Sequence, residues 1–524
     1  MDAMGNTALA SIIRTKKHYL RGWVLHLLCV LALMWTPLVN GFAFFFDDTT
    51  NYIRAADLAA HLVSQKEIST AWTARYAGQL PPSAGGSSKE AMPRPGPVQT
   101  DPQFRTHNDI SAGLVMTGRS PYIGALMWVG YVTSNFWLFI AFQATLAYFL
   151  IYLTLKRFGI VDRKVVTSVV LLLAALTTLP FYNGMLLADA FGAFGILAFL
   201  LLSTPGKLTK LEIFLLFMTI VTAVVSHLTH IVLLAGMLGQ LVLLALFKNV
   251  MKVPTRGWVA AIGGLLIGFV SLQITAFATE KVMGKEPQLL PLMSARFIAD
   301  GPGRDFLDAG CNGNRFQICR VERGDLSHAS AILSVTRPGV GTYLLATPEE
   351  RRKMGEEDKA FAIAVFLHDP VAQTGAIIRN TFKQLTWVEY TGLNRNCSDR
   401  AYCWVAIPEA VGEDMKTTLA DKEAWPEGAM DALLKIAVVI SLIVLAYCLL
   451  APGDQGDWRH SILRNWVLIT FAAMVLMSGF GGAVVEPQWR YISRLIWLTV
   501  LFAMIAAILR WEPALAARES APST

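Results

Sequence analysis

Long apolar runs separated by short basic loops are the feature that most constrains this chain. Several runs approach the roughly 20 apolar residues that a helix needs to cross a bilayer, and the first extends from about Trp23 to Phe46. Hydrophobic residues make up 54% of the chain and charged residues 16%, whereas a typical soluble domain is about 25% charged. We therefore predict an all-α polytopic membrane protein with about ten transmembrane helices, each near the length that a bilayer requires.

The order of the runs also predicts which loops face the cytoplasm. The helices are expected at about 22–46, 134–155, 165–180, 186–203, 211–226, 231–247, 257–279, 431–450, 465–483 and 492–509. Every loop that this order places inside is rich in Lys or Arg, which is the positive-inside pattern. Both termini are thus expected in the cytoplasm, and the net charge of +7 indicates orientation, not nucleic-acid binding. The helices between 165 and 247 are short, so a re-entrant pair could replace one pair of crossings.

Composition divides the chain into four parts. We expect a membrane domain at 1–279, an extracytoplasmic region at 280–430, further membrane helices at 431–510 and a cytoplasmic tail at 511–524. The outer loop at 47–133 contains an amphipathic segment from Thr49 to about Ala77 and an interfacial helix at 121–133. Between them lies a stretch rich in Pro and Gly, 79–105, that is typical of a flexible loop. The 280–430 region is mixed and partly helical, an α(+β) insertion, and Thr347 opens one of its helices.

Cysteine positions agree with this sidedness. Two cysteines lie within predicted membrane helices, and the other four fall in the region assigned outside: Cys311, Cys319, Cys397 and Cys403. Two close pairs in an oxidising compartment predict the local disulfides Cys311–Cys319 and Cys397–Cys403. A zinc site is the alternative, but the spacings are not those of a CxxC motif.

Carboxylates occur at two outer turns of the predicted bundle. Asp47 and Asp48 end the first apolar run, and Asp189 lies several residues into the helix predicted at 186–203. An ionised carboxylate in hydrocarbon is costly, so these acids must face protein, a cation or water, and they are candidate functional residues. The alternative for the pair is that it caps the following helix, because Asp is a favoured N-cap residue.

Two other outer turns carry basic, acidic and aromatic side chains. His227 and His230 are three residues apart and could bind a metal or a phosphate; the alternative is that they are interfacial polar residues. Glu486, like Asp189, is a candidate for a second acid of the site, and it precedes Arg490 and Tyr491 in the sequence. Arg490 could bind an anion or extend to the membrane surface. Together these turns predict one cavity that opens to the outer side.

Such a cavity suits transfer chemistry at the membrane surface. A carboxylate can remove a proton from a hydroxyl, while Arg or His holds the phosphate of a lipid carrier and stabilises its charge as it leaves. A single carboxylate acting as base predicts one displacement with inversion at the sugar carbon.

The order of these features resembles the GT-C superfamily of polytopic membrane glycosyltransferases, which use polyprenyl-phosphate sugars. In that superfamily an acidic motif and an amphipathic helix open the first outer loop, which matches Asp47 and Asp48 here. A second acid comes from later outer loops, where Asp189 lies, and an Arg-Tyr pair opens a late helix, as Arg490 and Tyr491 do. The resemblance implies Asp47 or Asp48 as catalytic base, the other as a metal or acceptor contact, and Arg490 as a ligand of the carrier phosphate. Many members place their soluble domain after the last helix, whereas this chain inserts it at 280–430.

The function that follows is transfer of a sugar from a polyprenyl-phosphate donor to a lipid-linked or cell-surface glycan on the non-cytoplasmic face. We expect the chain in the inner (plasma) membrane of a bacterium, in contact with membrane lipids and without nucleic acid, and a divalent cation (Mg or Mn) is a candidate cofactor. One alternative is a transporter or flippase of a lipid-linked glycan, although no internal repeat is present. Others are a polysaccharide ligase and an acyl- or phosphoethanolamine-transferase.

Overall fold

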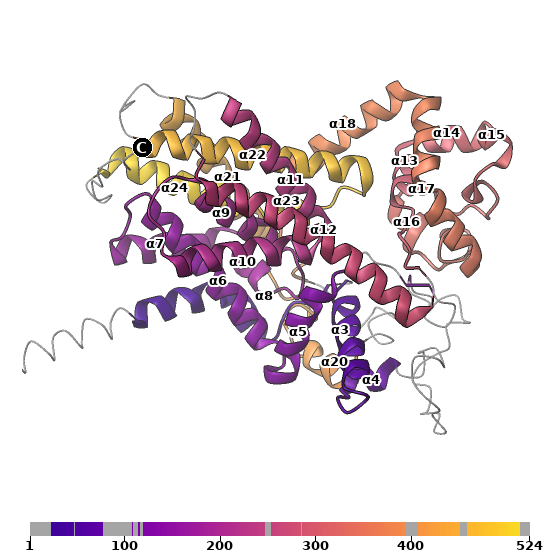
Figure 1. Ribbon diagram of the computed structural model, residues 1–524, viewed down its shortest axis with the longest axis horizontal. Helices are drawn as coiled ribbons and strands as arrows, with labels where there is room; N and C mark the ends of the chain where they lie inside the picture. The colour runs from indigo at the N-terminus through magenta and orange to yellow at the C-terminus, as the bar shows by residue number, and fades with distance from the viewer. Residues whose placement is uncertain are drawn as a thin grey trace, which may run out of the picture.

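Helices make up most of the computed structural model (Figure 1). It describes residues 23–46, 48–76, 107, 114–115, 119–246, 253–284, 286–390, 392–394, 407–450 and 458–513. Within these ranges the sheet content is limited to isolated bridges, such as the parallel bridge between Phe44 and Met185. The all-α prediction is therefore confirmed for the part of the chain that the structure describes. The α(+β) prediction for 280–430 is wrong in its β part, because the described residues of that region form helices and no strand.

The first apolar run is broken, whereas the sequence predicted one helix to Phe46. A helix at Trp23–Ala32 is followed by a turn and by α2 (Trp35–Asn40), which ends at Gly41 with a left-handed φ of +87°. The backbone beyond it is extended: Phe44 donates its N–H to the carbonyl of Gly184, and Leu186 donates to that of Phe44. Glycine adopts this φ readily, and the following residues then find backbone partners in another segment.

The bundle itself follows the predicted order closely. Its helices are α5 (Pro121–Ser134), α6 (Trp137–Arg157), α7 (Arg163–Leu176), α8 (Leu179–Gly184), α9 (Ala190–Ser203), α10 (Lys210–Ser226), α11 (Leu228–Leu246), α12 (Thr255–Met283), α21 (Glu427–Leu450), α22 (Trp458–Val484), α23 (Arg490–Ser493) and α24 (Trp497–Trp511). Six described helices are long and apolar enough to cross a membrane, and one bent pair would bring the number to seven. The chain is a polytopic membrane protein, while the predicted number of about ten spans is not confirmed.

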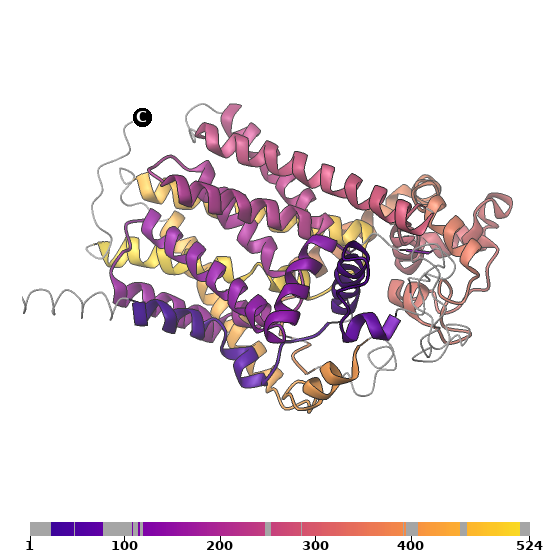
Figure 2. The ribbon, with the colours of Figure 1, turned by 60° about the horizontal axis from the view of Figure 1, so that its bottom comes forward.

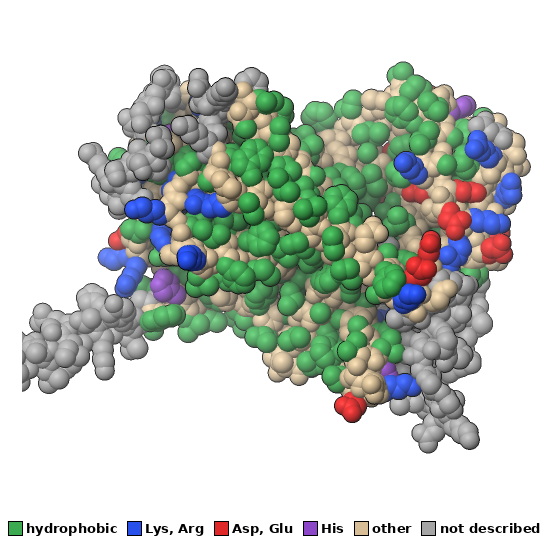
Figure 3. All heavy atoms as spheres, in the orientation of Figure 1, with side chains coloured by type: hydrophobic (Ala, Val, Ile, Leu, Met, Phe, Trp, Pro, Cys, Tyr) green, Lys and Arg blue, Asp and Glu red, His purple; other side chains and the backbone are tan. Residues whose placement is uncertain are grey.

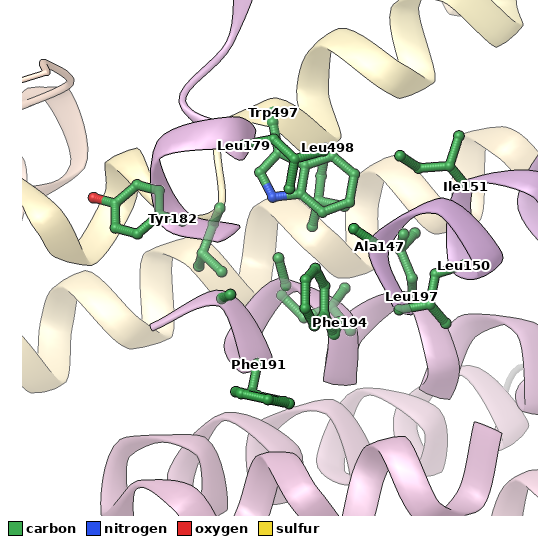
Figure 4. Packing of buried hydrophobic residues seen from close by; sticks show 14 of the residues in the cluster. Ala147, Leu150, Ile151, Leu179, Tyr182, Phe191, Phe194, Leu197, Trp497 and Leu498 are labelled. Atoms are coloured by element: carbon green, nitrogen blue, oxygen red, sulfur yellow. The ribbon is translucent and has the colours of Figure 1, made fainter. Parts of the chain in front are cut away.

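Helix α9 forms the centre of the bundle. It is apolar on every side and almost all of its residues are buried, as expected for a helix that other helices surround. Phe194 and Leu197 of α9 pack among residues of α6, α8 and α24, including Ala147 and Trp497 (Figure 4). The residue before α9 is Asp189, so this packing fixes one of the candidate acids.

Two groups of helices lie outside the bundle. Near the N-terminus lie α3 (Thr49–Val63) and α4 (Ala71–Tyr76), two helices with a break between them, within the stretch predicted to be amphipathic. The outer lobe, residues 292–368, has its own hydrophobic core and contains α13 (Leu292–Asp300), α14 (Pro302–Asp308), α15 (Cys311–Asn314), η4 (Gln317–Cys319), α16 (Ala329–Ser334) and α17 (Pro348–His368). The predicted Cys311–Cys319 disulfide is present, while Cys397 and Cys403 lie outside the described residues.

The end of the 280–430 region leaves the outer lobe and returns to the bundle. Helix α18 (Pro370–Thr386) packs along α22, and α20 (Glu409–Lys416) lies beside the N-terminal helices in two views (Figures 1 and 2). Asn40 fixes this return, because its Oδ1 accepts hydrogen bonds from the backbone of Ala420 and the indole of Trp425. Trp425 is buried in the core of the bundle.

Apolar and charged side chains occupy separate zones of the surface, as expected for a membrane protein. Hydrophobic side chains cover the middle of the face in Figure 3, between an end where Lys and Arg gather and an end over the outer lobe where both signs of charge occur. Long α12 carries exposed apolar residues over much of its length, from Val259 to Phe277. These faces suit contact with acyl chains.

Close packing of α5 on α3 gives a stability prediction at Gly124. A Cβ atom there would lie 2.3 Å from the carbonyl oxygen of Tyr52, and backbone cannot move as freely as a side chain. We expect Gly124→Ala to destabilise the protein by about 1–3 kcal/mol, seen as a lower midpoint of thermal unfolding in detergent. Gly239→Ala is the matched control, because no atom lies within 4 Å of its added Cβ. A Gly124→Ala variant that melts with the wild type would contradict this packing.

Candidate functional site

Asp48 lies just before α3 and forms ion pairs instead of a helix cap. Its side chain makes no capping hydrogen bond. Arg119 pairs with one carboxylate oxygen, and Nη2 of Arg490 lies 3.3 Å from the other. The capping alternative therefore does not hold for Asp48, while Asp47 lies outside the described residues.

Asp189 occupies the N-cap position of α9, not the interior of a helix as predicted. The segment before it is extended where it meets Phe44, so the helix starts at Ala190 and not at 186. The carboxylate makes no cap bond and pairs with Arg494. Its other oxygen lies 4.0 Å from Nη1 of Arg490.

Arg490 therefore lies between two carboxylates that come from distant parts of the sequence. Its side chain is only 10% exposed, and its guanidinium lies over the rings of Phe46 at 4.6 Å and Tyr491 at 5.4 Å. Among the described residues, its Nε atom has no hydrogen-bond partner. A buried N–H group of Arg490 is thus left without an acceptor, and an anion would supply one.

Helix α8 fixes the backbone that carries Arg490. The hydroxyl of Tyr182 donates to the carbonyl of Arg490 at 3.3 Å, and the hydroxyl of Thr178 donates to the carbonyl of Ser493. Both donors are buried. The short helix α23 is thereby held at the start of α24.

Arg494 connects the carboxylates to the histidine turn. Its side chain is 1% exposed, and its Nη2 donates to Oγ1 of Thr229 at 3.4 Å. That hydroxyl lies 2.7 Å from Nδ1 of His227, and the rings of His227 and His230 are 5.5 Å apart. The histidines thus border the site, although His227 precedes α11 and the two do not share a helical face.

Glu486 is not part of this group. Its carboxylate accepts a hydrogen bond from the backbone of Ser330 at 3.0 Å and lies 3.6 Å from the ring of His328. Glu486 therefore joins the end of the bundle to α16 of the outer lobe. Glu486 therefore contacts the outer lobe and does not lie with Asp48 and Asp189 as a second acid of the site.

Two of the site arginines were missed by the sequence interpretation. Arg494 follows Arg490 by one helical turn, which is a signal that could have been used. Arg119 precedes the N-cap Ser120, and nothing in the sequence links it to Asp48.

The described charges of the site do not cancel. Arg119, Arg490 and Arg494 supply three positive charges and Asp48 and Asp189 supply two negative charges, which leaves 3 − 2 = +1. Burial alone would raise the pKa of Asp48, but Arg119 and Arg490 outweigh it and lower that pKa to about 2. Asp47, next to Asp48, lies outside the described residues and is not part of this count.

The lowered pKa of Asp48 predicts how stability depends on pH. The folded-state pKa of about 2 lies below the ordinary value of 3.8, so the ionised group stabilises the fold above pH 4 and loses this effect as pH falls toward 2. The shift corresponds to a contribution on the order of 2 kcal/mol. We expect the difference in unfolding midpoint between wild type and Asp48→Asn to stay constant from pH 8 to 5 and to shrink at pH 3. A difference that grows on acidification would contradict these ion pairs.

Metal binding stays a prediction. Among the described residues, no group of three or more His, Cys, Asp or Glu side chains lies close enough together to hold a metal ion. Asp47 is outside these residues, so the predicted Mg or Mn contact is not tested.

Comparisons with known proteins add little to this geometry. No protein-family model matches the chain, and no curated protein matches it. Among solved structures, the chain is similar to the crystal structure of ArnT from Cupriavidus metallidurans bound to undecaprenyl phosphate. The identity is 11% and the TM-score is 0.32, over 94% of this chain and 78% of that chain. Since similarity at this level carries no argument about function, the proposal below rests on the contacts within this chain.

Proposed function

We propose that the chain is a membrane glycosyltransferase that takes a sugar from a polyprenyl-phosphate donor on the non-cytoplasmic side. The observation that carries this proposal is Arg490, which is buried between Asp48 and Asp189 and has an unpaired Nε. The free Nε–H of Arg490 can donate to an anionic oxygen of a lipid-linked phosphodiester. A guanidinium also presents a planar set of donors that matches phosphate oxygens.

The position of the site suits a lipid donor. It lies where several apolar helices begin or end, at the N-cap of α9 and the start of α23. A polyprenyl chain could remain in the bilayer while its phosphate reaches Arg490.

In the proposed reaction, the acceptor hydroxyl attacks the anomeric carbon of the donor sugar. A new C–O bond to the acceptor forms as the C–O bond to the phosphate breaks, and the configuration at that carbon inverts. The acceptor proton passes to a carboxylate base. The polyprenyl phosphate leaves with both electrons of the broken bond, and Arg490 and Arg119 stabilise its increased negative charge.

The two acids of the pair take different roles in this proposal. A carboxylate with a pKa of about 2 is a weak proton acceptor near neutral pH. We therefore assign proton removal to Asp47 and give Asp48 the role of orienting Arg119 and Arg490. Asp189 orients Arg494 and, at a longer distance, Arg490.

The test is to follow the lipid product in proteoliposomes. Purified protein is given three donors that carry the same radiolabelled sugar, a polyprenyl monophosphate, a polyprenyl diphosphate and a nucleotide. The proposal predicts free polyprenyl phosphate and labelled acceptor glycan from the first donor alone. Movement of an intact lipid-linked glycan across the bilayer, with no change in its chemistry, would favour the flippase instead.

A further inference from the structure

Helix α18 has its polar side chains turned inward and its apolar side chains turned outward. Gln373 and Gln384 are fully buried, whereas the side chains of Val371, Ile378 and Phe382 are 82%, 53% and 65% exposed. The three apolar positions are spaced by seven and four residues, which places them on one helical face. A helix on the surface of a soluble domain has the opposite arrangement.

The inward polar face is bound to the end of a membrane helix. Asn380 donates to Asp300 at 2.9 Å and to the carbonyl of Gly482 at 3.3 Å. Gln384 donates to the carbonyl of Gln488 at 2.8 Å and accepts from the same residue's N–H at 2.7 Å. These contacts hold α18 against α13, the last turn of α22 and the residues that follow it, so its outward face lies beside the end of a helix long enough to cross a membrane.

The apolar face continues around the bend that precedes α18. Helices α17 and α18 meet at an angle of 112°, and the last turns of α17 expose Ile363, Phe366 and Leu367 at 50%, 38% and 73%. Hydrophobic atoms cover this part of the molecule in Figure 3, beyond the middle of the bundle. The bend therefore presents apolar side chains on both of its arms.

The charged residues within α18 are basic, while Asp369 at the bend caps the helix by accepting a hydrogen bond from the N–H of Ala372. Helix α18 has no Asp or Glu, and Arg379 and Lys383 are exposed on the same side as Ile378 and Phe382. The ammonium of Lys383 lies 4.9 Å from the centre of the Trp387 ring. An apolar stripe beside basic and aromatic residues is typical of a helix in the headgroup region of a membrane.

We propose that the outward face of the α17–α18 bend is a membrane-docking surface that inserts into the leaflet nearest the candidate site. Acyl chains contact Val371, Ile378 and Phe382, and Arg379 and Lys383 bind the phosphates of anionic lipids. A bilayer is the occupant because α22 brings this face to the membrane edge and because its charge is complementary to anionic headgroups. Asp300 links α18 to the outer lobe, so docking also fixes the height of the lobe above the membrane.

Fluorescence quenching by brominated lipids tests this surface in the full chain. Ile378→Cys is labelled with bimane and reconstituted in vesicles of phosphatidylglycerol and phosphatidylethanolamine, with or without bromine on the acyl chains. Glu349→Cys at the start of α17 is the control, since its side chain is 79% exposed in the outer lobe. Unsubstituted protein gives the background from the native cysteines, which include buried Cys29 and Cys448.

The proposal predicts loss of bimane emission at position 378 in brominated vesicles and no loss at position 349. Equal emission with and without bromine at position 378 would overturn it. So would an oxidative cross-link between two Ile378→Cys chains in nanodiscs, which would show that a second copy covers the face.

Discussion

Replacing Arg490 by Lys is expected to reduce the rate of sugar transfer by about 10²–10³-fold, the cost of losing a preorganised donor at a developing charge. Lysine keeps the positive charge but loses the planar set of donors that spans Asp48, Asp189 and a phosphate. It also loses the flat contacts with the rings of Phe46 and Tyr491. The measurement is the initial rate with a polyprenyl-phosphate sugar in proteoliposomes.

Arg464→Lys is the matched control for this substitution. Arg464 is an exposed residue near the start of α22, far along the helix from its last turn, and its replacement should leave the rate unchanged. Donor binding should be weakened as well in Arg490→Lys, because the phosphate contacts that residue before the reaction. If Arg490→Lys transfers sugar at the wild-type rate, Arg490 does not bind the leaving phosphate.

Removing the carboxylate of Asp189 is expected to destabilise the protein by about 3–5 kcal/mol, because it leaves a buried charge without its partner. Arg494 is 1% exposed and pairs with Asp189, and its Nε has no partner among the described residues. Asp189→Leu should therefore lower the unfolding midpoint strongly. The second substitution Arg494→Met in the same chain should restore much of the loss, since it removes the uncompensated charge.

A surface ion pair supplies the control for Asp189. Glu413 and Lys416 are 59% and 39% exposed, and exposed pairs contribute about 0–1 kcal/mol, so Glu413→Ala should change the midpoint little. An Asp189→Leu variant as stable as Glu413→Ala would contradict the buried pair. A double variant that is less stable than Asp189→Leu alone would do so too.

The helices were predictable because their apolar runs and basic loops are local features. The start of α10 and the position of α12 follow from such patterns, and the capping box at Thr347 marks α17 correctly. The break before Phe44 was not predictable, since that segment is apolar like a helix and gains its extended form from a bridge to Met185. Tertiary contacts decided its conformation, which a local pattern does not report.

The site was only partly predictable for the same reason. Asp48 and Arg490 were found because each stands at the end of an apolar run, and the structure brings them within 3.3 Å. Glu486 has the same local signal, yet it contacts the outer lobe. Arg119 has no local signal, and its role depends on the fold that returns it to Asp48.

The most direct measurement is sugar transfer from a polyprenyl-phosphate donor by Asp47→Asn, Asp48→Asn and the double variant, with donor binding measured in parallel. We predict that Asp47→Asn loses transfer while it still binds donor, since the base is gone and the arginines remain. Asp48→Asn should change donor binding as well as rate, because Arg119 and Arg490 lose their shared partner. Wild-type transfer in both single variants and in the double variant would show that the acidic pair has no part in the reaction.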